Sequence, residues 1–106
     1  VTIEAALLET PLVVTHSLSP LTFEFARRVT RVASSCMVNL IAGRGIVPER
    51  LQDQARPAAL AALLARPLRS SRARGEMRAQ LIAATSHLGK PGAAERVADL
   101  AFQLAV

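Results

Sequence analysis

The pattern of hydrophobic and polar residues predicts mostly helices, with one clear strand near the start of the chain. Residues 3–9 have helical spacing, and Thr2 before them is a residue type that often caps helices. The apolar, β-branched run PLVVTH at 11–16 predicts a buried strand. After the break SLSP, Ser19 is placed to cap a helix that begins at Pro20.

That helix, residues 20–32, has an amphipathic pattern. Its apolar stripe consists of Leu21, Phe25, Val29 and Val32. The charged residues on its other side are Glu24, Arg27, Arg28 and Arg31.

The middle of the chain predicts a second extended segment and a turn. Residues 37–41 form an apolar run that we expect to be extended, and the chain is then predicted to turn at Gly43 and Gly45. Pro48 suits the first turn of a short helix over residues 48–54.

Helices dominate the rest of the sequence. A helix of high propensity is predicted over residues 57–68, followed by a polar linker at 69–75. A second amphipathic helix over 76–88 is closed by a glycine and a proline, and a last helix covers 92–105. One face of that last helix carries Val97, Leu100, Ala101 and Leu104.

This order predicts an α/β fragment that is predominantly α-helical, with one or two short strands and about five to six helices. Residues 1–106 would form a single partial domain, in which residues 1–56 hold the strand, loop and helix core and residues 57–106 the C-terminal helices. One strand and part of another cannot make a doubly wound sheet, so we expect the chain to be the back end of a Rossmann-like domain.

Composition supports a globular chain of modest stability. It is 51% hydrophobic and 20% charged, with three Phe and no Trp or Tyr. A single cysteine, Cys36, allows no intramolecular disulfide. The N-terminal sequence lacks the basic region of a signal peptide, and no apolar run is long enough to span a membrane.

The net charge of +5 is concentrated in the second half of the chain. A solvated helix surface is the favoured interpretation of this cluster over binding to phosphate, anionic lipid or nucleic acid. Nucleic-acid binding ranks last because no recognition motif or interleaved aromatic residue accompanies the charge. The clustered arginines are Arg66, Arg69, Arg72, Arg74 and Arg78.

The stretch NLIAGRGIVPE at 39–49 carries a family resemblance. Together with TIEAALLETPLVV, LSPLTFEFARR and LQDQARPAALAALL, it resembles the lipid-A-disaccharide synthases, which are GT-B glycosyltransferases. The resemblance covers almost the whole chain but only about the C-terminal third of a family member. Val38, Ser17 and His16 depart from the family pattern, where proline, a basic residue and an aromatic residue are common.

The resemblance implies a transferase that joins UDP-2,3-diacylglucosamine to 2,3-diacylglucosamine 1-phosphate and releases UDP. It also implies that the nucleotide sugar binds this half and that the general base lies in the other half. We therefore assign no catalytic residue, no metal and no cofactor to this chain, and we expect the fragment alone to be inactive. Neither His16 nor His87 has an acid–base partner at a recognisable spacing.

Two candidate UDP-sugar residues lie on the first helix. The resemblance places Glu4 where a carboxylate accepts both ribose hydroxyls, whereas the residues alone favour a first-turn glutamate stabilised by the helix dipole. Thr2 lies at the same helix N-terminus, whose N–H groups suit a diphosphate.

The remaining candidates lie in and after the NLIAGRGIVPE stretch. Asn39 suits either ligand contact or a tied-down turn, and Gly43 suits a special conformation or a close backbone approach. Arg44 has two equal interpretations, contact with the diphosphate or an ion pair with Glu49. Gln52 is predicted to bond the same loop.

The expected partners are the two acylated sugars and, peripherally, the inner face of the cytoplasmic membrane. The helix from residue 20 and the arginine cluster would lie near that surface or a partner subunit. A homo-dimer formed by exchange of the C-terminal helices is also expected. The alternative hypothesis is a basic helical module that dimerises through Ala/Leu faces and has no catalytic activity.

Overall fold

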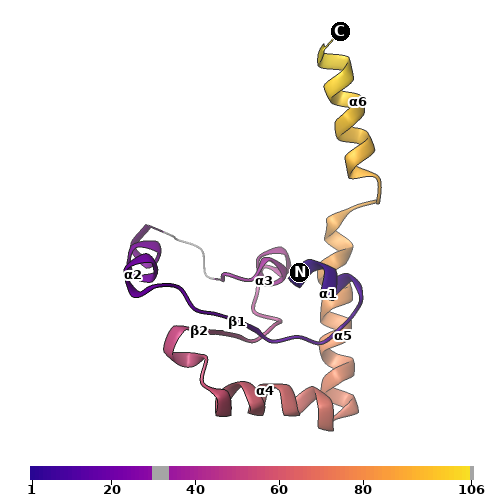
Figure 1. The fold of residues 1–106 in the computed structure, drawn as a ribbon. Coiled ribbons are helices and arrows are strands. Elements are labelled where there is room, and N and C mark those ends of the chain that lie inside the picture. The colour runs from indigo at the N-terminus through magenta and orange to yellow at the C-terminus, as the bar shows by residue number, and fades with distance from the viewer. Residues whose placement is uncertain (30–33, 106) are drawn as a thin grey trace.

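Two short parallel strands lie beside a group of helices in the computed structural model, which describes residues 1–29 and 34–105 (Figure 1). Residues Arg31 and Val32 of the predicted amphipathic helix lie outside the described ranges. The elements in chain order are α1 (Thr2–Leu7), β1 (Val14–His16), α2 (Pro20–Val29), α3 (Met37–Ala42), β2 (Glu49–Leu51), α4 (Pro57–Arg69), α5 (Ser71–Thr85) and α6 (Ala93–Ala105). Short 3₁₀ turns cover Gln52–Gln54 and Ser86–Leu88.

The predicted fold class, a mostly helical α/β fragment, is confirmed. β1 pairs in parallel with β2, and Val14 lies opposite Glu49 in the register. α2 and α3 lie between the two strands in the sequence, which makes this a βαβ arrangement with a long crossover. The strand predicted over 11–16 is confirmed in its last three residues, but the prediction that it is buried is wrong, because Thr15 and His16 are exposed.

The extended segment predicted over 37–41 is wrong, and the short helix predicted over 48–54 is wrong except in its last three residues, where Gln52–Gln54 form a 3₁₀ turn. The apolar run of 37–41 is the helix α3, because its exposed and buried positions recur with helical spacing and Gly43 closes it in the left-handed conformation at φ 65°. A short apolar run does not by itself distinguish a strand from a buried helix. Residues after Pro48 form β2 rather than a helix, with Pro48 directly before the strand, a position that proline tolerates.

The linker predicted over 69–75 is also wrong. α5 begins at Ser71 and runs through this segment, with the Ser70 hydroxyl accepting a hydrogen bond from the Ala73 amide as an N-cap. Arg72 pairs with Glu76 one turn later, which further favours the helix. The helices predicted over 57–68 and 92–105 are confirmed as α4 and α6.

The core forms where α5 packs against α1 and α3. Small and medium side chains fill this core, as expected for a chain with few aromatic residues. Its alanines allow the helices to pack closely together. Its buried hydrophobic residues are Ala6, Cys36, Val38, Ile46, Val47, Leu81 and Ala84. Because α3 and the segment after it contribute three of these seven residues, Val38, Ile46 and Val47, the core fixes the NLIAGRGIVPE stretch in place.

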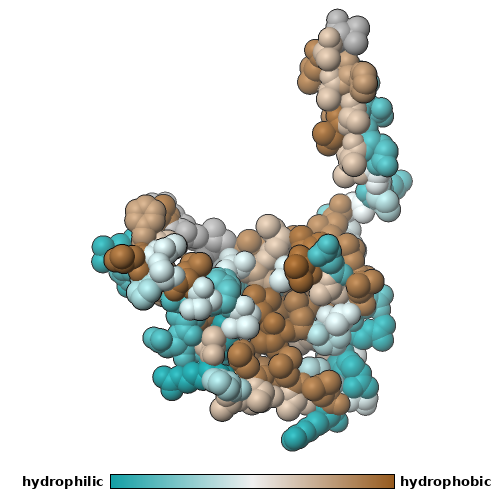
Figure 2. All heavy atoms as spheres, in the orientation of Figure 1, coloured by the Kyte–Doolittle hydropathy of each residue, from teal (hydrophilic) through white to brown (hydrophobic). Residues whose placement is uncertain are grey.

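α2 and α6 are among the helices that present apolar side chains to solvent. α6 extends away from the other elements, and Figure 2 shows hydrophobic surface along it. Val97 and Leu104 on α6 are 64% and 87% exposed. On α2 the described part of the predicted apolar stripe is exposed as well, at Leu21, Phe25 and Val29. No helix in the described residues is both long enough and apolar enough to cross a membrane.

Candidate functional site

Asn39 is buried on α3 and ties the following loop to this helix. Its Oδ1 accepts hydrogen bonds from the amides of Ile46 and Val47, both at 2.8 Å. Its Nδ2 donates to the Val47 carbonyl at 2.8 Å and to Oε1 of Glu49 at 2.7 Å. Two donated and two accepted bonds use the full capacity of a side-chain amide. The structure therefore shows the interpretation in which Asn39 stabilises a turn through hydrogen bonds. Contact between Asn39 and a ligand stays a prediction.

The Glu49 carboxylate is equally well satisfied. Its Oε1 accepts from the Ser34 hydroxyl and Asn39, and its Oε2 accepts from the Ser35 amide at 2.9 Å and the Ser35 hydroxyl at 2.7 Å. Burial raises the pKa of this carboxyl, but the bonds from Ser34, Ser35 and Asn39 outweigh it and lower the pKa to about 2. We call these four residues the Asn39–Glu49 cluster.

The two serines of this cluster are missing from the sequence-based site. Ser34 and Ser35 precede α3, and neither spacing nor residue type pairs them with a glutamate about fifteen positions later. The signal available in the sequence is a pair of hydroxyls before a buried amide. That pattern is too common to predict that the two hydroxyls bond a distant carboxylate.

Arg44 lies in the turn of residues 43–45, which we call the Arg44 turn. Gly43 has φ 65°, a conformation that side-chain residues rarely adopt, and all three residues are exposed. The predicted ion pair between Arg44 and Glu49 is wrong, because the four donors of the cluster occupy the carboxylate. Among the described residues Arg44 has no ion-pair partner, so its guanidinium faces solvent.

The side chain of Gln52 hydrogen-bonds a different loop from the one predicted. Its side chain accepts a hydrogen bond from the Leu18 amide at 2.6 Å and donates to the Leu18 carbonyl at 2.9 Å. It therefore ties the end of β2 to the connection between β1 and α2 and does not bond the Arg44 turn. Its own backbone has a positive φ of 50°, so this tie holds a strained residue.

Thr2 and Glu4 lie on α1, which packs against α3 and α5. Thr2 is the first residue of the helix and is half-buried, while Val1 occupies the N-cap position without a side-chain cap. The Glu4 carboxylate is exposed. The structure thus brings the helix of Thr2 and Glu4 beside the helix of Asn39, although their binding roles stay predictions.

The arginine cluster forms a solvated surface of α4 and α5, as predicted. Arg66 and Arg69 lie in the last turn of α4, where positive charge stabilises a helix end. Arg72 pairs with Glu76, and Arg78 pairs with Glu9 of the segment after α1. Two of the five clustered arginines are therefore paired within the chain.

Two hollows lie beside the sheet. One has a volume of about 430 Å³, and its wall includes Ser35, His16 at the end of β1, and both the first and the last residue of β2, Glu49 and Leu51. The other, of about 290 Å³, lies where the Arg44 turn leads into β2 and meets α4 and α5. Among the described residues no group of three or more His, Cys, Asp or Glu side chains is placed to hold a metal ion.

Comparison with known proteins identifies relatives along nearly the whole chain. The family model described as lipid-A-disaccharide synthetase matches residues 1–100. The lipid-A-disaccharide synthase of Anaeromyxobacter dehalogenans is 44% identical over 98 residues, which cover 92% of this chain and 26% of that protein. The enzyme of the same name from Trichlorobacter lovleyi is 36% identical over 104 residues, 98% of this chain and 27% of that protein.

A third relative, the lipid-A-disaccharide synthase of Acidobacterium capsulatum, is 39% identical over 105 residues, 97% of this chain and 26% of that protein. The chain therefore spans about a quarter of the length of the curated relatives it matches. No solved structure matches it.

Proposed function

The chain belongs to the lipid-A-disaccharide synthetase family, and we propose that it is part of a glycosyltransferase of lipid A biosynthesis. The reaction we propose joins UDP-2,3-diacylglucosamine to 2,3-diacylglucosamine 1-phosphate and releases UDP. The single observation that supports this most strongly is the family match over residues 1–100. It favours the transferase hypothesis over a helical module without activity.

We propose that the sequence-predicted residues have two roles, contact with the ligand and stabilisation of the loops around it. Arg44 and Glu4 have exposed charged side chains, so they are available to the diphosphate and the ribose of the nucleotide sugar. Thr2 and Gly43 assist through the backbone around them. Asn39, Glu49 and Gln52 serve the site by holding its loops, since their polar atoms already bond within the chain.

The experiment is a titration of the full-length protein with UDP, followed by the same titration of Arg44→Ala and Glu4→Ala. Each variant removes a charge-assisted hydrogen bond, so we expect UDP affinity to fall by about tenfold in each. Glu95→Ala on α6 is a matched control, since it removes an exposed carboxylate from another helix. Unchanged affinity in both test variants contradicts the assigned roles.

We also propose that the full-length protein works at the inner face of the cytoplasmic membrane. The support is α2, whose exposed apolar stripe of Leu21, Phe25 and Val29 lies on the same helix as Arg27 and Arg28. Co-sedimentation with vesicles containing anionic lipid tests this. The stripe variant Phe25→Ser is expected to bind them less than the unchanged protein, and equal binding contradicts the assignment.

The exposed face of α6 supports the proposed exchange of C-terminal helices between two copies of the protein. Leu100 and Leu104 on this face are 58% and 87% exposed, and such a surface in water favours a covering partner. Sedimentation of the full-length protein is expected to show a dimer that Leu100→Glu weakens. A monomer at all concentrations contradicts the exchange.

A further inference from the structure

α2 lies apart from the core that α1, α3 and α5 form (Figure 1). None of its residues, Pro20–Val29, is buried, and the helix has only slight contact with the other described elements. Its apolar stripe of Leu21, Phe25 and Val29 is exposed to solvent. Close packing therefore does not fix α2 in place, and its position depends on the chain segments on either side of it.

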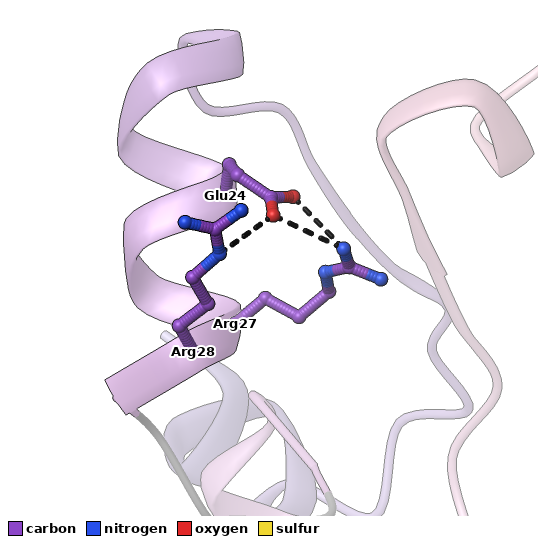
Figure 3. Close-up of polar contacts among 3 residues, drawn as sticks. All are labelled: Glu24, Arg27 and Arg28. Carbon is purple, nitrogen blue, oxygen red and sulfur yellow. Dashed lines mark hydrogen bonds and ion pairs between the residues drawn. The ribbon is translucent and has the colours of Figure 1, made fainter.

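Bonds among its own residues stabilise α2 as a helix. The Ser19 hydroxyl accepts a hydrogen bond from the Thr22 amide at 3.3 Å, which caps the start of the helix. Figure 3 shows Glu24 between Arg27 and Arg28, with its carboxylate 3.0 Å from Nη2 of Arg27 and 2.9 Å from Nε of Arg28. Pairs three and four residues apart favour a helix without help from other elements. α2 can therefore keep its form while its position is set elsewhere.

The chain before α2 is attached to the end of β2 through Gln52. The Gln52 side chain accepts a hydrogen bond from the Leu18 amide at 2.6 Å and donates one to the Leu18 carbonyl at 2.9 Å. Two bonds from one amide group fix direction as well as distance, because both must keep their geometry. Leu18 directly precedes the Ser19 cap, so this attachment lies at the very start of the helix. We call it the Leu18 attachment.

The chain after α2 is attached to the start of β2 through Glu49. Its carboxylate accepts hydrogen bonds from the Ser34 hydroxyl and from the Ser35 amide and hydroxyl, the last two at 2.9 and 2.7 Å. We call this the serine attachment. Glu49 is the first residue of β2 and Gln52 directly follows its last. At about 3.3 Å of rise per residue, the two attachments are about 10 Å apart along one strand.

The strand that holds both attachments also continues from the Arg44 turn. Asn39 accepts hydrogen bonds from the amides of Ile46 and Val47 and donates one to Glu49 at 2.7 Å. The Arg44 turn, β2 and the two attachments therefore belong to one hydrogen-bonded unit. Loss of the Leu18 attachment changes the angle between α2 and this unit, while Asn39 still holds the turn itself.

We propose that Gln52 is a positioning residue, which together with the serine attachment sets the orientation of membrane-bound α2 relative to the Arg44 turn. This inference rests on the proposed function, because it takes α2 as the membrane contact and the Arg44 turn as part of the substrate site. With α2 on the lipid surface, the two attachments hold the turn at one height and one angle above it. A substrate whose acyl chains stay in the bilayer then meets the turn in a productive geometry.

Loss of the Leu18 attachment leaves the membrane contact intact but frees the angle of the sheet. The bound protein then adopts several orientations, and the apparent affinity for a substrate held in the bilayer falls with the fraction that is productive. A substrate dissolved in water reaches the site in every orientation. The proposal therefore predicts a defect that depends on how the substrate is presented.

The first test measures kcat and KM of the full-length protein with substrates held in anionic vesicles and with water-soluble, short-chain analogues. We expect Gln52→Ala to raise KM for vesicle-held substrate about fivefold at unchanged kcat, and to leave KM for the soluble analogues within about twofold. UDP affinity and vesicle binding should be unchanged. Gln54→Ala is the matched control, since Gln54 is exposed and makes no side-chain hydrogen bond to a residue that the structure describes.

The second test needs no activity. Spin labels at Arg28→Cys on α2 and Ala79→Cys on α5 report the distance between these helices, both at exposed positions, in a background without other exposed cysteines. Cys36 is buried and should stay unlabelled. On vesicles we expect one narrow distance distribution in the protein with Gln52 and a broader one after Gln52→Ala. Ser34→Ala with Ser35→Ala, which removes the other attachment, should broaden it as well.

An equal rise of KM for vesicle-held and soluble substrates overturns the proposal, because Gln52 would then act on the site itself. Unchanged KM for both, or an equally narrow distance distribution after Gln52→Ala, overturns it too. Absence of synthase activity in the unchanged protein refutes the proposed function instead, and the label distances then still decide whether Gln52 sets the position of α2.

Discussion

The ends and the middle of the NLIAGRGIVPE stretch differ in how their polar groups are used. Asn39 is 4% exposed and makes four hydrogen bonds, and Glu49 accepts four. Arg44, between them in the sequence, is exposed and has no ion-pair partner among the described residues. One short segment therefore contains both a saturated internal cluster and an uncommitted cation.

This difference separates the residues that shape a site from those that are free to contact a ligand. A buried amide with all its bonds made inside the chain fixes the loop of Ile46 and Val47, and thereby the Arg44 turn, in one position. An exposed arginine contributes little to stability but keeps all its donors. The following predictions test that separation through the free energy of unfolding of the full-length protein.

The largest loss of stability is expected for Asn39→Ala. It leaves the buried amides of Ile46 and Val47 and the Val47 carbonyl without partners, at a cost of about 3 kcal/mol in unfolding free energy. Urea denaturation measures this change. Gln103→Ala on the exposed face of α6 is the control, and a loss for Asn39→Ala no larger than that of the control would refute the role of the cluster.

The next effect is a dependence of stability on pH that comes from Glu49. Its folded pKa of about 2 lies below the ordinary value of 4.5, so its contribution is fully present above pH 4.5 and is lost as the pH falls toward 2. After allowance for solvent screening this contribution is roughly 2 kcal/mol. Urea denaturation between pH 5 and about pH 3 measures the slope.

Glu49→Gln is the matched variant for this pH series. It cannot ionise, so the part of the slope between pH 5 and 3 that belongs to Glu49 should disappear. Ser34→Ala with Ser35→Ala should raise the pKa of Glu49 and move its loss of stability to higher pH, because fewer donors stabilise the carboxylate. An identical slope in the unchanged protein and in Glu49→Gln contradicts this account.

Gln52→Ala is expected to cost about 1 kcal/mol of unfolding free energy. The variant loses the two bonds to the Leu18 backbone, which is only partly shielded from water, so water replaces part of them. Thermal or urea unfolding gives the value. Gln54→Ala, two residues later on the same 3₁₀ turn, makes no such bond and should leave stability within about 0.5 kcal/mol of the unchanged protein.

The smallest effect on stability, within about 0.5 kcal/mol, is expected for Arg44→Ala. Its side chain is exposed and makes no ion pair with another described residue, so the folded chain loses little. The same variant should nevertheless lower UDP affinity. A clear destabilisation by Arg44→Ala would mean that the turn depends on this side chain.

The sequence predicted the helical character, the first strand and the last helix because those segments have long or clear periodic patterns. It failed at α3, because a mostly apolar segment of only six residues fits a strand as well as a helix. It also failed at β2, whose three residues are polar or half-buried and gain their strand geometry from pairing with β1. Such pairing is a tertiary effect that no local pattern contains.

The candidate site shows the same limit. Asn39 and Glu49 were recognisable as residues with constraints, but their partners were not, since Ser34 and Ser35 lie about fifteen positions before Glu49 and meet it only through the tertiary structure. One of the two equal interpretations of Arg44, an ion pair with Glu49, relied on their opposite charges five positions apart. Two serine hydroxyls, the Ser35 backbone amide and the Asn39 side-chain amide bond the carboxylate instead. Arg44 therefore has no ion-pair partner among the described residues.

The most direct test measures UDP affinity and unfolding free energy on the same samples of full-length Arg44→Ala and Asn39→Ala, at a temperature where both are folded. The account predicts that Arg44→Ala weakens UDP binding about tenfold at unchanged stability, while Asn39→Ala loses about 3 kcal/mol of stability. Unchanged UDP binding in Arg44→Ala, together with weakened binding but full stability in Asn39→Ala, would contradict it.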